Sequence, residues 1–472
     1  MGWWVFAYLW IYLLHSSTHV DLVRRNHEAQ NEETNCMKLM RRIIHCLLIP
    51  AICIPMLTGC WDRLDPENMA FIMAIGVDTG PKNDYIYTFA VAMPKASSGA
   101  TASSVSGSDQ SSNKVVTIFS EEGANLSAAL LTSQSFVARR LTLIHSKALV
   151  LGEELARQGI LPVVGEVVRN TEFRRNVNIL TTKGRAQEYM HYIKPKMEND
   201  INLWFELELD PHNIGAITPK QARFHDFILD MEQPGNGATS ILTAARPDID
   251  KGSENLHDGE SANNSNTSQP MASEHKAGDL PRAGEVPIDF FGAAVYKGQK
   301  LRGFLNGMET KTLNMLRGQF EKTVWEFRDP SDPKLNISIN MGTLTNKVMH
   351  AQRFDDHIQI TFNITMEGDL LGSVSDVDYT QSENTKKLET SIEEQLKERA
   401  SKLLNKMLYK WEVDCFHIGN QIRGSFPTLQ DWYAYKWRDH IHTAKYDLNI
   451  QFKMRTYGDQ VGPVIEGDQM TE

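Results

Sequence analysis

The feature that most constrains this chain is a run of residues that ends at Cys60. Lys38, Arg41 and Arg42 stand ahead of an apolar stretch over 43–56. A helix needs about 20 apolar residues to cross a bilayer, so a run of about 14 is too short to span one. A positive start, a short apolar run and small residues before a cleavage point are typical of an export signal. The part that has to fold is therefore the chain after Cys60.

The residues Leu57-Thr58-Gly59-Cys60 resemble a bacterial lipobox. In such a signal the cysteine thiol accepts a diacylglyceryl group, and cleavage leaves that cysteine as the new N-terminus. Two acyl chains, at about 0.8 kcal/mol per buried CH₂, make a durable anchor. We therefore expect 37–59 to be a signal peptide and Cys60 to be lipidated. The alternative is a buried core helix over 43–56 that ends by chance at a cysteine.

Residues 1–36 do not fit this scheme, because a lipoprotein signal carries its charged region at the very start. A second short apolar patch, 3–14, is followed by a polar stretch that reaches Cys36. Translation from Met37 is the simpler interpretation. We interpret 1–36 as a spurious N-terminal extension and leave it out of the fold prediction.

Cysteine and charge counts restrict the chemistry further. Of the five cysteines, Cys415 alone would remain free after processing, so the sequence predicts no disulfide and no cysteine metal cage. Cys415 next to His417 is more simply a small buried thiol beside a surface histidine than a redox or metal pair. The net charge of −10 argues against nucleic acid as a partner and against a broad electrostatic hold on anionic lipid.

The mature chain is too long for one core, so two or three domains are expected. Two polar stretches interrupt it, a serine-rich one at 96–113 and one at 248–284 that has too little apolar surface to order itself. We predict an N-terminal mixed α/β domain over 61–195, a middle domain over 196–287 that contains the disordered insert 248–284, and a C-terminal α+β domain over 288–460.

Hydrophobic periodicity predicts strands interleaved with helices in the first domain. The expected strands are 70–77, 85–93, 115–119, 148–151 and 176–181, the first two forming a hairpin. Helical spacing covers 126–137 and 153–169, with interruptions at Gly159 and Pro162. The segment 204–210 alternates apolar and acidic residues, which favours a half-buried strand with Glu206, Glu208 and Asp210 on its wet face.

The last third has clearer patterns. Strict alternation over 358–366, 335–341 and 448–454 predicts an antiparallel sheet with one face on a core. A helix over 384–411 carries one apolar stripe, and the pairs Glu393–Lys397 and Glu398–Lys402 brace its exposed side. The stripe consists of Leu388, Ile392, Leu396, Ala400, Leu403, Met407 and Trp411. The expected fold class is α+β, with the C-terminal domain an antiparallel sheet packed with a long helix.

No catalytic motif is found: the sequence lacks a Gly-x-Ser-x-Gly elbow, a His-Glu-x-x-His pair, a P-loop and a dinucleotide fingerprint. Glu206 and Glu208 as paired carboxylates, or His145 as a base, are less favoured than structural roles for these residues. We predict no enzyme activity, no cofactor and no metal.

Two arginine pairs, Arg139-Arg140 and Arg174-Arg175, are local exceptions on an acidic chain. Arginine is favoured where a carboxylate or phosphate is recognised by a planar group. As partner-binding residues, they would dock an acidic loop of a partner subunit or contact lipid headgroups. The alternative is ordinary solvated or internally paired arginine.

Several motifs together resemble the Ger(x)C lipoproteins, the C subunits of nutrient germinant receptors in spore-forming Bacillota. The resemblance spans roughly residues 57–458, and it is their order and spacing that make these modest motifs specific. They are Cys60-Trp61-Asp62-Arg63, Ala74-Ile75-Gly76-Val77-Asp78, the block from His145 to Ala156, Glu172-Phe173-Arg174-Arg175-Asn176, Gly292–Lys297, Leu301–Asn306, Asp414 with Ile418-Gly419, Pro427 with Trp432, and Trp437. The polar insert, the serine-rich loop and the N-terminal extension depart from the family pattern.

The resemblance implies three mixed α/β domains and a non-enzymatic receptor subunit required for nutrient-triggered germination. Such a subunit sits on the outer face of the inner spore membrane, beside a multi-pass A subunit and a transporter-like B subunit. Two other classes remain open. A lipid-anchored solute-binding protein of a transporter would show two similar lobes of parallel βαβ units, and an exported hydrolase would need the catalytic motifs that are missing.

Overall fold

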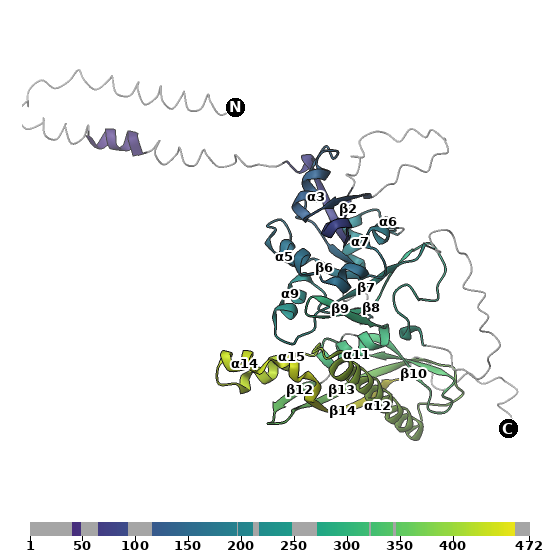
Figure 1. Ribbon diagram of the computed structural model, residues 1–472. Coiled ribbons are helices and arrows are strands. Elements are labelled where there is room, and N and C mark those ends of the chain that lie inside the picture. The colour runs from purple at the N-terminus through teal and green to yellow at the C-terminus, as the bar shows by residue number, and fades with distance from the viewer. Residues whose placement is uncertain are drawn as a thin grey trace, which may run out of the picture. The chain divides into compact units, whose positions relative to one another are not determined.

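Figure 1 shows the computed structural model, which describes residues 40–48, 65–92, 116–195, 197–210, 217–247, 271–320, 322–342 and 346–457. The chain divides into two compact units, Met1–Glu67 and Asn68–Glu472. In the first unit, residues 40–48 are helical. Cys60, residues 1–36, the serine-rich stretch 96–113 and the insert residues 248–270 lie outside the described residues. None of the helices described is both long and apolar enough to cross a membrane.

Nine described strands of the second unit form one mixed sheet. They are β1 (Met69–Thr79), β2 (Tyr85–Ala92), β3 (Val116–Gly123), β4 (Arg140–Thr142), β5 (Ala148–Gly152), β6 (Asn178–Thr182), β7 (Thr239–Ala245), β8 (Ile288–Lys297) and β9 (Lys300–Leu305). Their order is β3-β2-β1-β5-β6-β7-β8-β9, and β4 pairs with the start of β1. The neighbours β1, β5, β6 and β7 run parallel, as do β1 and β4, whereas the hairpin pairs are antiparallel.

Helices cover both faces of this sheet, as the mixed α/β prediction requires. They are α3 (Leu126–Ser133), α4 (Glu153–Gln158), α5 (Leu161–Arg169), α6 (Ala186–His191), α7 (Ile201–Glu208) and α9 (Phe224–Glu232). Apolar residues of α3, α4, α5 and α9 pack with Ile75 and Val77 of β1. Those of α6 and α7 pack on the other face with Met73 and Ala74, two successive residues at an irregularity in the β1–β2 register between Ile72 and Ala74.

The predicted strand over 204–210 is wrong, because most of this segment is the helix α7. Asp200 caps it, accepting a hydrogen bond from the backbone N–H of Asn202 at 2.9 Å. Ile201, Trp204 and Phe205 then bury one side at helical spacing. The sequence alternates apolar and acidic residues with a period of two, whereas the buried positions follow i, i+3 and i+4.

The predicted disorder of 248–284 is also wrong for its last part, since residues 271–284 are described and packed. Met271 and Ala277 are buried. The N–H of Ala277 donates to Phe291 O at 2.9 Å, and Arg282 Nε donates to the buried carboxylate of Asp289 at 2.6 Å. Arg246 donates to Leu280 O at 2.7 Å. Partners in β8 and directly after β7 therefore hold a segment whose own composition is too polar to form a core.

The sheet crosses both predicted domain borders. β6 and β7 pair on either side of the border at 195/196, and β7 and β8 pair on either side of the one at 287/288. The three-domain division stays a prediction about which parts of the chain fold independently.

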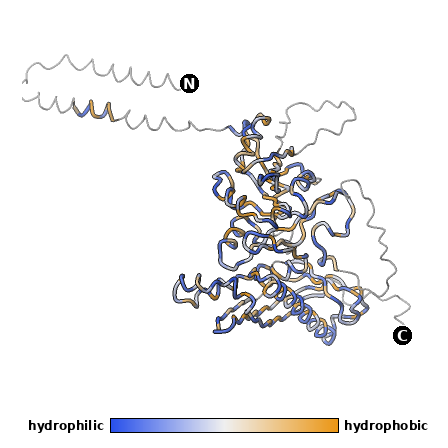
Figure 2. Tube along the Cα trace, in the orientation of Figure 1, coloured by the Kyte–Doolittle hydropathy of each residue, from blue (hydrophilic) through white to orange (hydrophobic). Residues whose placement is uncertain are grey.

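A second sheet forms the C-terminal part and confirms the predicted sheet with a long helix. Its described strands are β10 (Thr323–Arg328), β11 (Asn336–Met341), β12 (Asn346–Arg353), β13 (Ile358–Ser373) and β14 (Ala444–Thr456). The first four pair antiparallel, whereas β14 runs parallel to β13. A parallel neighbour requires a crossover, which the helices between β13 and β14 supply. Figure 2 shows hydrophobic and hydrophilic residues interleaved along these strands.

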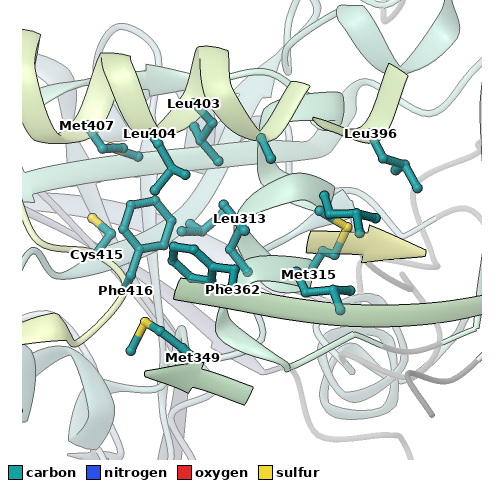
Figure 3. Close-up of a cluster of buried hydrophobic side chains, with 14 of the residues drawn as sticks. Leu313, Met315, Met349, Phe362, Leu396, Leu403, Leu404, Met407, Cys415 and Phe416 are labelled. Carbon is teal, nitrogen blue, oxygen red and sulfur yellow. The ribbon is translucent and has the colours of Figure 1, made fainter. Parts of the chain in front are cut away.

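The long helix α12 (Ser382–Leu404) lies along β13 and β14 and continues as the π-helical segment η5 (Asn405–Trp411). Every residue of its predicted stripe is buried. Figure 3 shows Leu403 and Leu404 of α12 on the side of the helix that faces Leu313 and Phe362, with Leu396 farther along the same helix. Leu313 belongs to α11 (Gly307–Arg317), which packs beside α12. The remaining described helices are η1 (Pro66–Asn68), η2 (Pro81–Asn83), η4 (Ala272–Glu274), α13 (Ile418–Ile422), η6 (Arg423–Ser425), α14 (Leu429–Tyr435), α15 (Trp437–His440) and η7 (Ile441–Thr443).

Side chains of α12 also bond the backbone of two edge strands of the five-stranded sheet, β14 and β10. Glu389 and Glu393 accept from the backbone N–H groups of Met454 and Phe452 in β14 at 2.8 and 2.9 Å. On the other flank, Gln395 bonds both backbone groups of Arg328, the last residue of β10. An open edge is a template for pairing with another chain, so these contacts protect β14 and β10 from such pairing. The predicted Glu398–Lys402 pair is present at 2.6 Å, while Glu393 serves β14.

A buried lysine and a half-buried arginine also bond the backbone of β10. Arg399 of α12 donates to Glu326 O at 2.8 Å, and Lys311 of α11 donates to Val324 O at 2.7 Å. Burial lowers the pKa of the Lys311 ammonium to about 8, against a smaller opposing effect of Glu326. It also lowers the pKa of Arg399 to about 10.

Lys311→Met removes this titration and gives a pH test. Because the folded pKa of about 8 lies below the unfolded value of 10.5, the unfolded state binds more protons between these pH values. The free energy of unfolding of the native protein should therefore rise with pH across that window, by about 1–2 kcal/mol relative to Lys311→Met. Denaturant unfolding at pH 8 and pH 10 measures this. The control is Lys386→Met at an exposed position of α12; a pH-independent difference for Lys311→Met would contradict the assignment.

Candidate functional site

The two arginine pairs come together at one edge of the nine-stranded sheet. Parallel strands start at the same edge, so the loops that lead into β4, β5 and β6 lie next to one another there. Arg139-Arg140 precedes or opens β4, Lys147 precedes β5, and Arg174-Arg175 precedes β6. Arg223 joins them through a bridge between its backbone and that of Asn178. We call this group the basic edge: Arg139, Arg140, Lys147, Arg174, Arg175 and Arg223.

Glu172 fastens the two arginine-bearing loops to each other. Its carboxylate lies 3.3 Å from the guanidinium of Arg140 and accepts from Thr142 Oγ1 at 2.9 Å and from the N–H of Leu143 at 3.1 Å. The loop before β6 is thereby bonded across to β4. The pairs are distant in sequence, and this carboxylate is the contact that makes them neighbours.

A cavity of about 480 Å³ opens at the basic edge. Lys147 reaches across it to Glu206 of α7, with Nζ and Oε1 2.5 Å apart. The imidazole of His145, which also lines the cavity, stands edge-on to Phe71 of β1, with ring centroids 5.0 Å apart. The residues that line the cavity are Ile144, His145, Ser146, Lys147, Arg174, Asn176, Asn178, Phe205, Glu206, Leu209, Asp210 and Arg223.

Four arginines of the basic edge have no anionic side-chain partner among the described residues. Arg139, Arg174, Arg175 and Arg223 are exposed, and their guanidinium groups make no hydrogen bond or ion pair with another residue that the structure describes. Arg140 and Lys147, by contrast, are paired with Glu172 and Glu206. The edge therefore presents a local excess of positive charge on a chain of net charge −10.

The arrangement suits anion binding better than bond-making chemistry. Lys147 is held by Glu206 and His145 packs edge-on against Phe71, and neither is bonded to a serine, threonine or cysteine side chain among the described residues. Glu206 and Asp210 line the cavity, but Glu208 does not. Within the described ranges, no three His, Cys, Asp or Glu side chains are placed to share a metal ion.

Asp78 explains two of the motifs that the sequence suggested. Its carboxylate accepts from the N–H groups of Ala186 and Gln187 at 2.8 and 2.7 Å, which caps α6. Burial raises the pKa of Asp78, partly offset by these two hydrogen bonds. A Cβ on Gly152 would stand 2.0 Å from Asp78 Oδ1, so that position requires glycine. The sequence signal was a single aspartate after a buried strand, and nothing local identified its partner helix.

Asp414 is the corresponding buried carboxylate at the junction of the two sheets. It accepts from the N–H groups of Phe416, Ile418 and Gly419 and from Trp437 Nε1, at 2.8–3.0 Å. Its own backbone pairs with the segment that leads into β7, where Gly237 N–H donates to Asp414 O at 2.9 Å.

A buried side-chain network surrounds this junction. Arg317 of α11 donates to Cys415 O at 2.5 Å and to Thr239 Oγ1 at 3.1 Å. His417 Nε2 lies 2.8 Å from Asp230 Oδ1 of α9. Cys415 is fully buried, and burial raises the pKa of its thiol to about 12, so it is not a reactive thiolate.

Two protein-family models match this chain, one for each of the two sheet-containing parts. The family model described as "Spore germination protein N-terminal domain" matches residues 62–244, and the one described as "Spore germination B3/ GerAC like, C-terminal" matches residues 291–458. The chain belongs to the Ger(x)C family. The first match holds the basic edge and Asp78, and the second holds Asp414 and the five-stranded sheet.

Individual relatives agree with this membership. Spore germination protein YndF of Bacillus subtilis (strain 168) is 22% identical over 440 residues, which is 89% of this chain and 97% of that protein. Spore germination protein B3 of the same strain is 21% identical over 411 residues, 85% of this chain and 95% of that protein. Spore germination protein KC, also of that strain, is 29% identical over 154 residues, 32% of this chain.

The extent of these matches differs. The match with protein KC spans 37% of that protein, so the two align over less than half of its length. Among solved structures, the crystal structure of the GerBC protein is similar with a TM-score of 0.47 and 16% identity, covering 80% of this chain and 96% of that one. Of the Ger(x)C motif residues in this chain, Asp78, Gly152 and Asp414 are buried in the fold, whereas Arg174 and Arg175 are exposed.

Asp414→Ala tests the role of the junction carboxylate. The substitution leaves three backbone N–H groups and an indole N–H buried without an acceptor, so we expect a loss of about 3–5 kcal/mol in the free energy of unfolding. Asp414→Asn keeps one carbonyl oxygen as an acceptor, so its free energy of unfolding should lie between those of the native chain and Asp414→Ala. Denaturant unfolding of the purified chain provides the measurement, with exposed Asp439→Ala as the control. Equal stability of Asp414→Ala and the control would refute this role.

Proposed function

We propose that this protein is a lipid-anchored, non-enzymatic C subunit of a nutrient germinant receptor, required for nutrient-triggered germination. It acts by assembly with the membrane A and B subunits, on the outer face of the inner spore membrane. The observation that carries the proposal is family membership across both parts of the fold, 62–244 and 291–458.

The position of Cys60 supports the lipid anchor. The family match begins at residue 62, directly after the lipobox-like Leu57-Thr58-Gly59-Cys60. Basic residues and a short apolar run precede it in the order that an export signal requires. A diacyl anchor at this cysteine would hold the folded body at a membrane without a spanning helix.

The composition of the candidate site supports a role in binding. Its charged groups are exposed arginines, the Lys147–Glu206 ion pair and the carboxylate of Asp210. The two sheets also differ from a solute-binding protein of a transporter, for which two similar lobes are expected. One sheet here is a nine-stranded mixed sheet with helices on both faces, and the other is a five-stranded sheet closed by α12.

Cys60→Ala should abolish the anchor. We expect the native protein to lose its leader, to gain a diacylglyceryl group on Cys60 and to fractionate with membranes. The variant should stay unmodified and fail to support germination. Mass spectrometry of the protein from spores measures processing and acylation directly, with Cys46→Ala in the leader as the control. An unmodified Cys60 with the leader still attached in the native protein would disprove the anchor.

Assembly is tested separately by purification of the receptor. An affinity tag at the C-terminus of this chain should recover the A and B subunits from detergent-solubilised spore membranes, in amounts that survive washing at high salt. A tagged Asp414→Ala chain is the matched control, because its junction is expected to be destabilised and recovery should fall. Recovery of an acylated, folded native chain without either membrane subunit would count against the assembly role.

A further inference from the structure

The start of β1 lies beside the basic edge. Met69, the first residue of β1, pairs with Arg140 in the parallel β1–β4 register. Cys60 precedes Met69 by nine residues, and an extended chain of that length spans at most about 30 Å. A lipid anchor on Cys60 would therefore keep the start of β1, beside the basic edge, within about 30 Å of the membrane surface.

We propose that the basic edge binds the phosphate groups of anionic phospholipids, so that the anchored protein rests on its membrane through this edge. The inference depends on the proposed anchor for its location and adds the partner of the candidate site. Arginine presents a planar fork of donors that matches phosphate oxygens, and Arg139, Arg174, Arg175 and Arg223 have this fork free within the described part of the chain.

The chemistry of the surroundings favours lipid over an acidic protein segment. Protein interfaces depend on a few large apolar or aromatic anchors at their centre. None of the residues that line the cavity at the basic edge is an exposed large hydrophobic side chain, and Phe205 and Leu209 are buried. The cations come from several separate loops and form a surface, as a layer of phosphates requires.

The distribution of charge favours one orientation of the protein on an anionic membrane. The chain as a whole carries −10 and is repelled by an anionic surface. The field of exposed charges decays within about 10 Å at ordinary salt, so the local excess at the basic edge acts on headgroups while most acidic residues are screened. The anchor supplies the affinity, and the basic edge sets which side of the protein faces the lipid.

Vesicle binding of the full chain carrying Cys60→Ala tests this without the acyl anchor. The probes are vesicles of phosphatidylcholine alone and of an equimolar mixture with phosphatidylglycerol. We expect the partition coefficient to be higher on the mixture and to fall with salt. Arg139→Gln plus Arg174→Gln should lower it roughly thirtyfold on the mixture, at about fivefold per cation, and leave binding to phosphatidylcholine unchanged.

Arg423→Gln plus Arg438→Gln, two exposed arginines of the C-terminal part, is the matched control and should bind as the parent does. Unchanged thermal unfolding of both double variants excludes misfolding. Equal loss in the control, or no loss in the test variant, overturns the inference. So does a test variant in the acylatable chain that loses the A and B subunits yet still binds anionic vesicles, because that outcome assigns the edge to a protein partner. Acylation of Cys60 is scored independently, so failure of the anchor is recognised separately.

Discussion

The fold depends on one buried carboxylate. Asp414 gathers four N–H donors from Phe416, Ile418, Gly419 and Trp437, and its backbone joins the segment that leads into β7. A buried charge is tolerated when all its hydrogen-bonding capacity is used, and here the donors come from the C-terminal part while the backbone pairing reaches the N-terminal sheet. Gly237 allows this approach, since a Cβ there would stand 2.0 Å from Val413. The two sheets meet around this residue.

Side-chain hydrogen bonds to backbone groups also stabilise the five-stranded sheet. The stripe of α12 buries apolar surface, while on its flanks Glu389 and Glu393 bond β14 and Gln395 and Arg399 bond β10. One helix therefore supplies both a core and the edge protection that keeps strands from pairing with other chains. The cost is the burial of cations such as Lys311, whose pKa of about 8 reflects it.

The apolar cores and the Asp414 junction stabilise the fold, so the arginines of the basic edge are not needed for stability and can bind a partner. Its arginines stand on loops at the strand ends of a rigid sheet, where binding residues are commonly found. Glu172 and Glu206 pair with Arg140 and Lys147 and fix the frame, and the remaining arginines are left to an external anion. The proposed lipid-anchored subunit would use such a surface to contact its membrane.

The sequence by itself determined the periodic elements: the alternation in β11, β13 and β14 and the apolar stripe of α12 are local patterns, and family motifs covered the rest of the outline. It failed where local pattern and tertiary partner disagreed. The segment of α7 alternates like a strand, but Ile201, Trp204 and Phe205 face the sheet as a helix. Residues 271–284 are too polar to order alone, and Asp289 and Arg246 order them.

The arginine pairs were visible in the sequence, yet only the parallel strand register and the Glu172 contact decided that they form one surface. Hydrophobic spacing is encoded within a few residues, whereas a buried carboxylate finds its donors through space, across more than a hundred positions for Asp78 and Ala186.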